Sequence, residues 1–110
     1  MFRFFHEKFD VYRVSLEFVD FVEGFDTQWF ARNADRRRQL SRAADSIPPN
    51  IAEGLGHRSH GLRKKHLKIA MASASECHSI LDLLRRKGAK TDPALHHLRR
   101  VGQMLNRMLQ

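Results

Sequence analysis

Two adjacent prolines, Pro48 and Pro49, lie inside a stretch that otherwise has the pattern of an amphipathic helix. Proline has no amide hydrogen and its ring clashes with the preceding turn, so the pair should break or kink a helix. The apolar stripe nevertheless keeps its phase from Ile47 to Ile51, across the prolines. We therefore predict one continuous helix that starts near Ala34 or Asp35, is kinked at Pro48-Pro49 and is ended by Gly54 and Gly56. Its expected core-facing residues are Leu40, Ala43, Ala44, Ile47, Ile51 and Leu55.

Three further segments have helical periodicity. The first spans residues 9–25, where its length and the absence of turn residues favour a helix over a strand. The next spans residues 59–87, with a serine at its N-cap and a glycine directly after its end. The last has Thr91 or Asp92 as its cap and Pro93 at its first helical position.

The segment at residues 59–87 carries two adjacent apolar seams, with small residues in its middle that allow another helix to approach closely. One seam consists of Leu62, Ile69, Ala72, Ile80 and Leu83. The other consists of Leu67, Ala70, Ala74, Cys77, Leu81 and Leu84. We expect residues 24–33 to form a loop whose Trp29 and Phe30 cap the core or fill an interface. Residues 1–8 are expected to be a loosely ordered lead-in.

Four predicted helices, short connections and no convincing strand indicate an all-α fold, an antiparallel up-down four-helix bundle. The length of 110 residues fits one domain over residues 1–110. No run of about eighteen apolar residues occurs, so we expect no membrane-spanning helix and no membrane partner. The single cysteine, Cys77, cannot form an internal disulfide, and the first residues lack the pattern of a signal peptide. The expected location is therefore cytoplasmic.

Basic side chains are distributed unevenly along the chain, whose formal net charge is +8. Residues 1–31 hold three basic and six acidic side chains, residues 32–68 hold ten and three, and residues 69–110 hold seven and three. A central surplus of this size indicates either an anionic partner or charge-complementary self-assembly. The alternative is a solvated basic face that only keeps the protein soluble.

Most of the central surplus comes from two groups of residues that flank the proline-containing helix. One group stands at the start of the following helix, where the helix dipole disfavours positive charge. This placement points to an anion-binding surface, most simply for the phosphates of nucleic acid. No aromatic residue is interleaved with these cations, so we expect RNA or DNA to be bound without sequence preference. The predicted nucleic-acid-binding residues are Arg58, Arg63, Lys64, Lys65 and Lys68, to which Arg36, Arg37 and Arg38 add.

A polar stripe lies beside the apolar stripe of the proline-containing helix. It is either a functional site or a buried network between the second and third helices. We favour the structural network, because buried charges must be paired and such networks fix the register of packed helices. We expect Arg42 to pair with Glu76, and Glu53 to pair with Arg58 or His57. The predicted network comprises Arg42, Ser46, Asn50, Glu53 and Glu76.

Catalytic and metal sites have weaker support. His57, His60 and His66 suggest metal ligands, but no carboxylate or cysteine with a ligand spacing is found near them. Cys77 lies on an apolar seam and is interpreted as a small buried hydrophobic residue. The sequence has no phosphate-binding glycine loop and no paired-carboxylate signature. We therefore expect no catalytic residue, metal or cofactor, and a protein that is not an enzyme.

The most specific string in the sequence is Ser46-Ile47-Pro48-Pro49-Asn50-Ile51-Ala52-Glu53-Gly54. It is followed at a fitting distance by Leu67-Lys68-Ile69-Ala70 and Ser73-Ala74-Ser75-Glu76. Together these segments resemble a bacterial family of small four-helix-bundle proteins, named for open reading frames inside intervening sequences of 23S ribosomal RNA genes. His57 and His66 depart from the pattern of that family, which usually has arginine and phenylalanine at these positions.

The resemblance implies a ring-shaped homopentamer of bundles. It also implies kinship with the accessory protein of diversity-generating retroelements, a basic barrel that binds nucleic acid and a reverse transcriptase. Two hypotheses for this chain follow. It is a non-enzymatic oligomer that binds RNA or DNA through its basic face, or it is a scaffold or assembly module whose partner is another protein. In the second case the basic residues serve solubility or the pairing of subunits.

Overall fold

The computed structural model of the chain describes residues 1–25, 27–30 and 33–110. The described residues form α-helices and short 3-10 helices, and they contain no strand. The helices are η1 (Phe5–Lys8), α1 (Asp10–Glu23), η2 (Thr27–Phe30), α2 (Ala34–Gly56), α3 (His60–Arg86) and α4 (Asp92–Met108). The all-α prediction is confirmed, and the four long helices begin and end close to the predicted residues.

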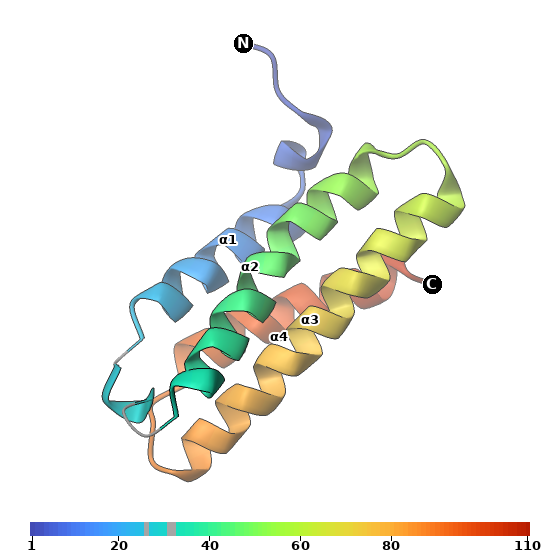
Figure 1. Cartoon of the computed structure of the whole chain (residues 1–110). Coiled ribbons are helices and arrows are strands. Elements are labelled where there is room, and N and C mark those ends of the chain that lie inside the picture. The colour runs from blue at the N-terminus through green and yellow to red at the C-terminus, as the bar shows by residue number, and fades with distance from the viewer. Residues whose placement is uncertain (26, 31–32) are drawn as a thin grey trace.

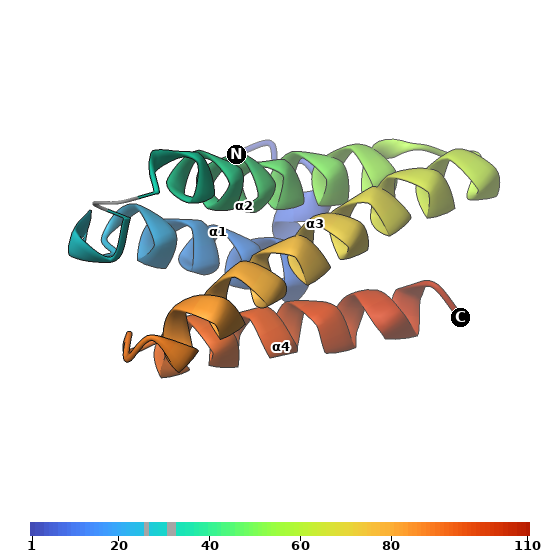
Figure 2. The same ribbon diagram turned by 60° about the horizontal axis from the view of Figure 1, so that its bottom comes forward.

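Consecutive α-helices run in opposite directions and pack side by side (Figures 1 and 2). α1 packs against α2 and α4, and α3 packs against the same two helices, with the α2–α3 pair forming the most extensive contact. Buried residues from all four α-helices form one apolar core, in which Phe18, Ile47, Leu81 and Leu105 are among the largest fully buried side chains. This arrangement is the predicted antiparallel up-down bundle.

α2 continues through Pro48 and Pro49 as one helix, which confirms that the apolar stripe runs in phase across them. Every residue of that stripe is buried, and Pro48 is buried with it. The prolines remove two amide donors from the helix. In the turn that contains them, the side-chain amide of Asn50 donates to the carbonyl oxygen of Ser46 at 2.8 Å, which adds a hydrogen bond within the helix.

α3 begins and ends at the two caps that the sequence predicts. The hydroxyl of Ser59 accepts a hydrogen bond from the amide of Leu62 at 3.3 Å. Gly88 follows the helix with φ of 103°, in the left-handed region that favours glycine. The two predicted seams differ: the seam from Leu67 to Leu84 is buried throughout, whereas the other is largely on the surface. Its large exposed members are Leu62, Ile69 and Leu83, with 43%, 39% and 44% of their surface accessible. Ala72 is also exposed, and only Ile80 of this seam is buried.

Within the predicted loop between α1 and α2, residues 27–30 form the 3-10 helix η2. Phe30 is buried in the core and Trp29 packs against it partly buried, as a core-capping role requires. Residues 26, 31 and 32 of this predicted loop lie outside the described residues. The lead-in likewise contains η1, although its segment before η1 extends away from the bundle (Figure 1).

The α2–α3 hairpin extends beyond the C-terminal end of α4 (Figures 1 and 2). The two helices approach closely near this projecting end, at Gly54. A Cβ atom on Gly54 would lie 3.1 Å from the carbonyl oxygen of Arg63 and 3.2 Å from the side chain of Leu67. A larger residue at this position would therefore push α3 away. Among the described residues, no helix has both the length and the apolar character needed to cross a membrane.

Candidate functional site

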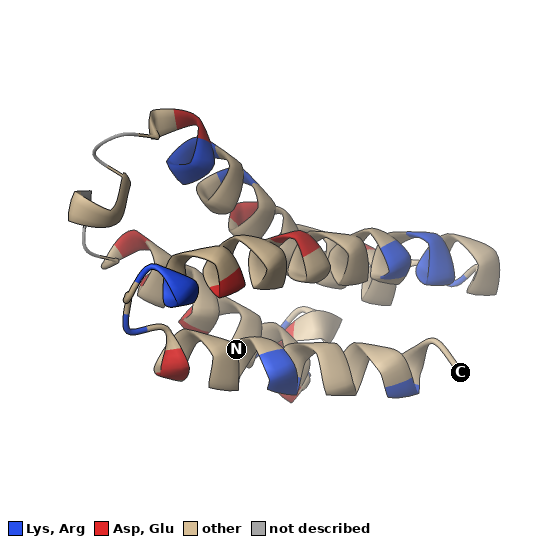
Figure 3. Cartoon of the chain, turned by 90° about the horizontal axis from the view of Figure 1, so that it is seen from below, with Lys and Arg blue, Asp and Glu red and all other residues tan. Residues whose placement is uncertain are grey.

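One group of the predicted basic residues gathers at the projecting end of the α2–α3 hairpin (Figure 3). Arg58 lies in the connection between the helices, and the others lie near the start of α3. The side chains of Arg58, Lys65 and Lys68 are exposed, and Lys64 is half-buried. We call these four residues the hairpin-end cations: Arg58, Lys64, Lys65 and Lys68.

The hairpin-end cations have no acidic partners among the residues that the structure describes. The first turn of α3 contains no acidic residue either. Lys64 and Lys68 are four residues apart on the same helix face, where two like charges repel by a few tenths of a kcal/mol. The cluster therefore presents positive charge that the fold itself does not neutralise, which favours binding of an external anion.

Arg63 differs from its neighbours because its guanidinium is engaged inside the hairpin. Its Nη2 donates to the carbonyl oxygens of Leu55 at 3.4 Å and His57 at 3.2 Å. These carbonyls belong to the end of α2, where the helix leaves its last acceptors without amide partners. Arg63 thus connects α3 to the end of α2, and we assign it a structural role in addition to its charge.

The other predicted basic group, Arg36 to Arg38, lies at the opposite end of α2. A helix of 23 residues is roughly 35 Å long, so the structure does not bring this group next to the hairpin-end cations. Arg38 forms an ion pair with Asp35. Arg37, Arg38 and Arg42 line an open groove of about 720 Å³ along the first half of α2. Within one chain, only an extended ligand could contact both groups.

A polar network between α2 and α3 is present, but its members differ partly from those predicted. The side-chain amide of Asn50 donates to the Ser46 hydroxyl at 3.1 Å, and the same hydroxyl accepts a hydrogen bond from Ser73 at 3.0 Å. The Oδ1 atom of Asn50 lies 3.2 Å from Nδ1 of His66. The predicted network included Ser46 and Asn50 but not the two α3 residues, His66 and Ser73.

The predicted pair of Arg42 and Glu76 is found on the surface and not in a buried network. Nη2 of Arg42 lies 3.5 Å from Oε1 of Glu76, and the two side chains are 74% and 45% exposed. The expectation of a buried ion pair is therefore corrected. Exposed pairs of this kind contribute little to stability, because water screens the charges and both side chains lose rotamer freedom.

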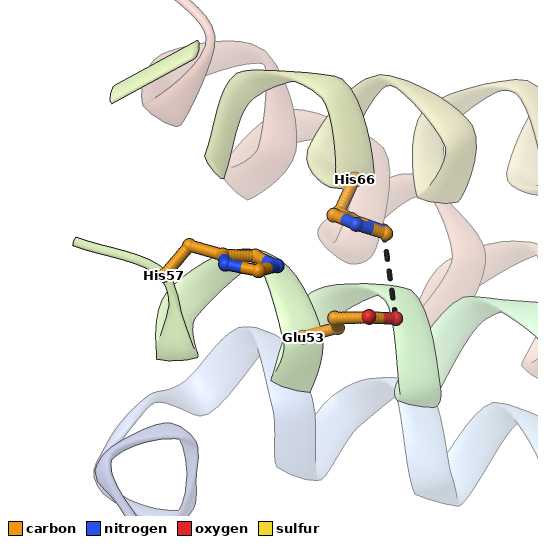
Figure 4. A group of neighbouring side chains, drawn as sticks. All are labelled: Glu53, His57 and His66. Carbon is orange, nitrogen blue, oxygen red and sulfur yellow. Dashed lines mark ion pairs between the residues drawn. The ribbon is translucent and has the colours of Figure 1, made fainter. Parts of the chain in front are cut away.

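Glu53, the remaining member of the predicted network, faces two histidines (Figure 4). Its Oε2 lies 3.6 Å from Nδ1 of His66, so Glu53 can form an ion pair with His66 when that ring is protonated, and not with Arg58 or His57 as predicted. The rings of His57 and His66 are stacked, with centroids 5.3 Å apart and planes inclined by 16°. One potential ligand atom from each of Glu53, His57 and His66 lies within 4.8 Å of the others.

The candidate metal ligands in the structure differ from those that the sequence suggests. The sequence suggests His57, His60 and His66, with no carboxylate at a ligand spacing near them. The fold excludes His60 from the group and brings in Glu53. The proximity of Glu53 and His57 could have been predicted from the sequence, because residues four apart share a helix face. The contribution of His66 depends on the register of α3 against α2, which the sequence does not specify.

Cys77 occupies the centre of the buried α3 seam and is fully buried. Burial raises the pKa of its thiol to about 12, with smaller contributions from the charges of Glu76 and Asp45. The thiol is therefore protonated at neutral pH and is not a reactive nucleophile. The prediction that Cys77 is a small buried hydrophobic residue is confirmed.

Comparison with protein families identifies a matching family. The family model described as 23S rRNA-intervening sequence protein matches residues 7–110. The match confirms the resemblance first seen in the string around Pro48 and Pro49. The relation to the accessory protein of diversity-generating retroelements stays a prediction. A comparison with curated proteins finds no match.

Proposed function

The chain belongs to the family of 23S rRNA-intervening sequence proteins, and we propose that it is a non-enzymatic, oligomeric protein that binds RNA or DNA without sequence preference. The hairpin-end cations are the proposed contact surface for phosphate groups. The name of the family places its genes within ribosomal RNA genes, which is compatible with an RNA ligand. The proposal for this chain rests on its charge distribution.

The observation that carries the proposal is the set of unpaired cations at the projecting hairpin end. Lys64, Lys65 and Lys68 have no acidic partner in the described structure, and they lie in the first three turns of α3. Phosphate contacts by lysine and arginine supply most of the affinity in non-specific nucleic-acid binding. No phenylalanine, tyrosine or tryptophan lies among these cations in the sequence, so base stacking is not part of the proposed mode.

The exposed apolar seam of α3 supports the oligomeric part of the proposal. Leu62, Ile69 and Leu83 are separated by multiples of seven residues, so they lie along one line of the helix surface. Burying this line against a second copy would remove apolar surface from water and place hairpin ends of several copies in one assembly. With +8 per chain, a ring of five copies would carry a charge of about +40, which favours binding to a polyanion.

The alternative function is a scaffold that binds another protein, and the exposed aromatic residues near the N-terminus favour it. Phe2 and Phe4 are 77% and 61% exposed, and their rings contact each other edge to face with centroids 5.1 Å apart. Such residues, together with the α3 seam, can contact an apolar partner surface. Under this alternative the hairpin-end cations serve solubility or the pairing of subunits.

A matched pair of charge-reversal variants tests the proposal. The first variant changes Lys64, Lys65 and Lys68 to Glu, leaving the structural Arg63 intact. The control changes Arg85, Arg86 and Lys87 to Glu, which alters the net charge by the same amount at the other end of α3. Binding of fluorescently labelled 20-nucleotide RNA and DNA is measured by anisotropy at low salt, and oligomer mass by light scattering.

We expect the hairpin-end variant to bind at least about 100-fold more weakly than the wild type and to keep its oligomer mass. The control should lose considerably less affinity, because only the general field of the protein changes. Absence of binding by the wild-type chain would overturn the proposal in favour of the scaffold. Equal losses in both variants would refute the assignment of the hairpin end as the contact surface.

A further inference from the structure

Glu53, His57 and His66 converge at the base of the projecting hairpin end, where α2 ends and α3 begins (Figure 4). Glu53 and His57 come from the last turn of α2 and the residue that follows it, and His66 comes from α3. We propose that these three side chains form a binding site for a divalent transition-metal ion, with Zn²⁺ as the reference ion. The site is separate from the hairpin-end cations and does not depend on the proposed function.

The donor set selects the class of metal. Two imidazoles and one carboxylate suit Zn²⁺, Co²⁺, Ni²⁺ or Cu²⁺, and they leave at least one coordination position for water. Ca²⁺ and Mg²⁺ prefer oxygen ligands, of which this group offers only the carboxylate of Glu53. We therefore expect imidazole-preferring ions to bind and alkaline-earth ions not to compete with them.

The His66 ring is held in place by the polar network behind it. The Asn50 amide donates to the carbonyl oxygen of Ser46 at 2.8 Å and to its hydroxyl at 3.1 Å, so the Asn50 oxygen faces His66. That oxygen lies 3.2 Å from Nδ1 of His66, which favours the tautomer with a proton on Nδ1. Nε2 then keeps the lone pair that a metal requires, whereas the Glu53 carboxylate lies 3.6 Å from Nδ1 and must move toward Nε2 to share an ion with it. A ring oriented through its other nitrogen is the usual arrangement for a metal-binding histidine.

The other two donors are free to adjust to an ion. The side chain of Glu53 is 59% exposed, and the ring of His57 is half-buried and makes no hydrogen bond among the described residues. Ligand atoms around Zn²⁺ lie about 3.3 Å apart, given bond lengths of about 2.0–2.2 Å. The present limit of 4.8 Å exceeds this spacing. The stacked His57 ring and the Glu53 carboxylate must therefore rotate toward the ion while His66 stays in place.

Arg63, next to the proposed site, links it to α3 and also affects its charge. Arg63 donates to the carbonyl oxygen of His57, which anchors the backbone of that ligand to α3. The positive charge of Arg63 opposes a second cation, whereas the carboxylate of Glu53 favours it. A bound ion would join the end of α2 to the start of α3, and it would stabilise the folded chain because the unfolded chain lacks the assembled site.

The test uses the untagged full-length chain, freed of metal with a chelator. Zn²⁺ binding is followed by calorimetry at pH 7.5, and Co²⁺ binding by its visible absorption. The site variants are Glu53→Gln and His57→Ala, both at accessible positions. The matched control is His60→Ala, which removes an exposed histidine three residues from His57 and outside the group.

We expect one Zn²⁺ per chain in the wild type and in His60→Ala, with an increase in melting temperature on binding. Each site variant should bind at least ten-fold more weakly and lose that increase, while circular dichroism shows an unchanged helical fold. No binding by the wild type would overturn the proposal, and so would wild-type affinity in the Glu53→Gln and His57→Ala variants.

Discussion

The two ends of α3 both carry clusters of positive charge, but their surroundings differ. At the C-terminal end, Arg85 and Arg86 lie in the last turn, where the helix dipole favours cations. Arg85 also forms an ion pair with Asp82 at 2.9 Å, and this hydrogen bond lowers the pKa of the Asp82 carboxyl group. At the N-terminal end, Arg58 lies just before the helix, where the dipole disfavours positive charge, and none of the hairpin-end cations has an acidic partner among the described residues.

This difference separates cations that their surroundings in the folded chain stabilise from cations that they do not. The cations at the C-terminal end each gain up to about 1 kcal/mol from the dipole, and Arg85 gains a few tenths of a kcal/mol more from its pair with Asp82. Lys64 and Lys68 repel each other and receive no such compensation. Their end of α3 is held in place by other means, namely the Ser59 cap, the Arg63 hydrogen bonds and the close contact at Gly54. The unexplained charges therefore mark the surface that we propose to bind an external anion.

The largest expected effect concerns the contact that holds the N-terminal end of α3 against α2. Replacing Gly54 with Leu forces a side chain into space occupied by Arg63 and Leu67, and should lower the free energy of unfolding by about 2–3 kcal/mol. Gly56→Leu is the control, because no atom lies within 4 Å of a Cβ at that position. Chemical denaturation of both variants measures the difference. Equal stabilities would show that the helices do not pack closely at Gly54.

A smaller effect tests the comparison of the two ends directly, through opposite responses to charge reversal. Lys64→Glu removes a repulsion with Lys68, creates an attractive pair with it, and should raise the free energy of unfolding by about 0.5 kcal/mol. Arg85→Glu removes the pair with Asp82, adds negative charge at the end of the helix, and should lower it by about 0.5–1 kcal/mol. Thermal and urea denaturation provide both values. Changes of the same sign would contradict the distinction between the ends.

The smallest effect concerns the ion pair between Arg42 and Glu76, which lies away from both ends of α3. Glu76→Gln breaks the surface pair with Arg42, and it should change the free energy of unfolding by less than about 0.5 kcal/mol. Urea denaturation is again the measurement. A loss of several kcal/mol would mean that the pair is buried in the assembled protein, for example between subunits.

Much of the fold could be predicted because local sequence rules determine it. The unbroken spacing of the apolar stripe from Leu40 to Leu55 was sufficient to predict that α2 continues through Pro48 and Pro49. Ser59 and Gly88 likewise mark the ends of α3. The choice between the two seams of α3 was not predictable in this way. Both seams have helical spacing, and only the packing of α3 against α2 and α4 decides which one is buried.

The candidate sites were less predictable because they depend on relations between helices. The separation of Arg36–Arg38 from the hairpin-end cations follows from the length of α2, and it could have been anticipated from helix geometry. The contact of Glu53 with His66 could not, because a shift of α3 by one residue would replace His66 with a neighbour. For the same reason, the sequence indicated a polar stripe on α2 but did not identify Ser73 or His66 as its partners.

The most direct test of the central claim is the salt dependence of binding to a 20-base-pair DNA duplex. Each phosphate contact contributes about −0.9 to the slope of log affinity against log salt concentration. With four hairpin-end cations, the slope for each contacting chain should lie between about −3 and −4. Changing Lys64, Lys65 and Lys68 to Gln should make that slope shallower by nearly 3. An affinity that does not respond to salt, or a slope that these substitutions leave unchanged, would contradict the account.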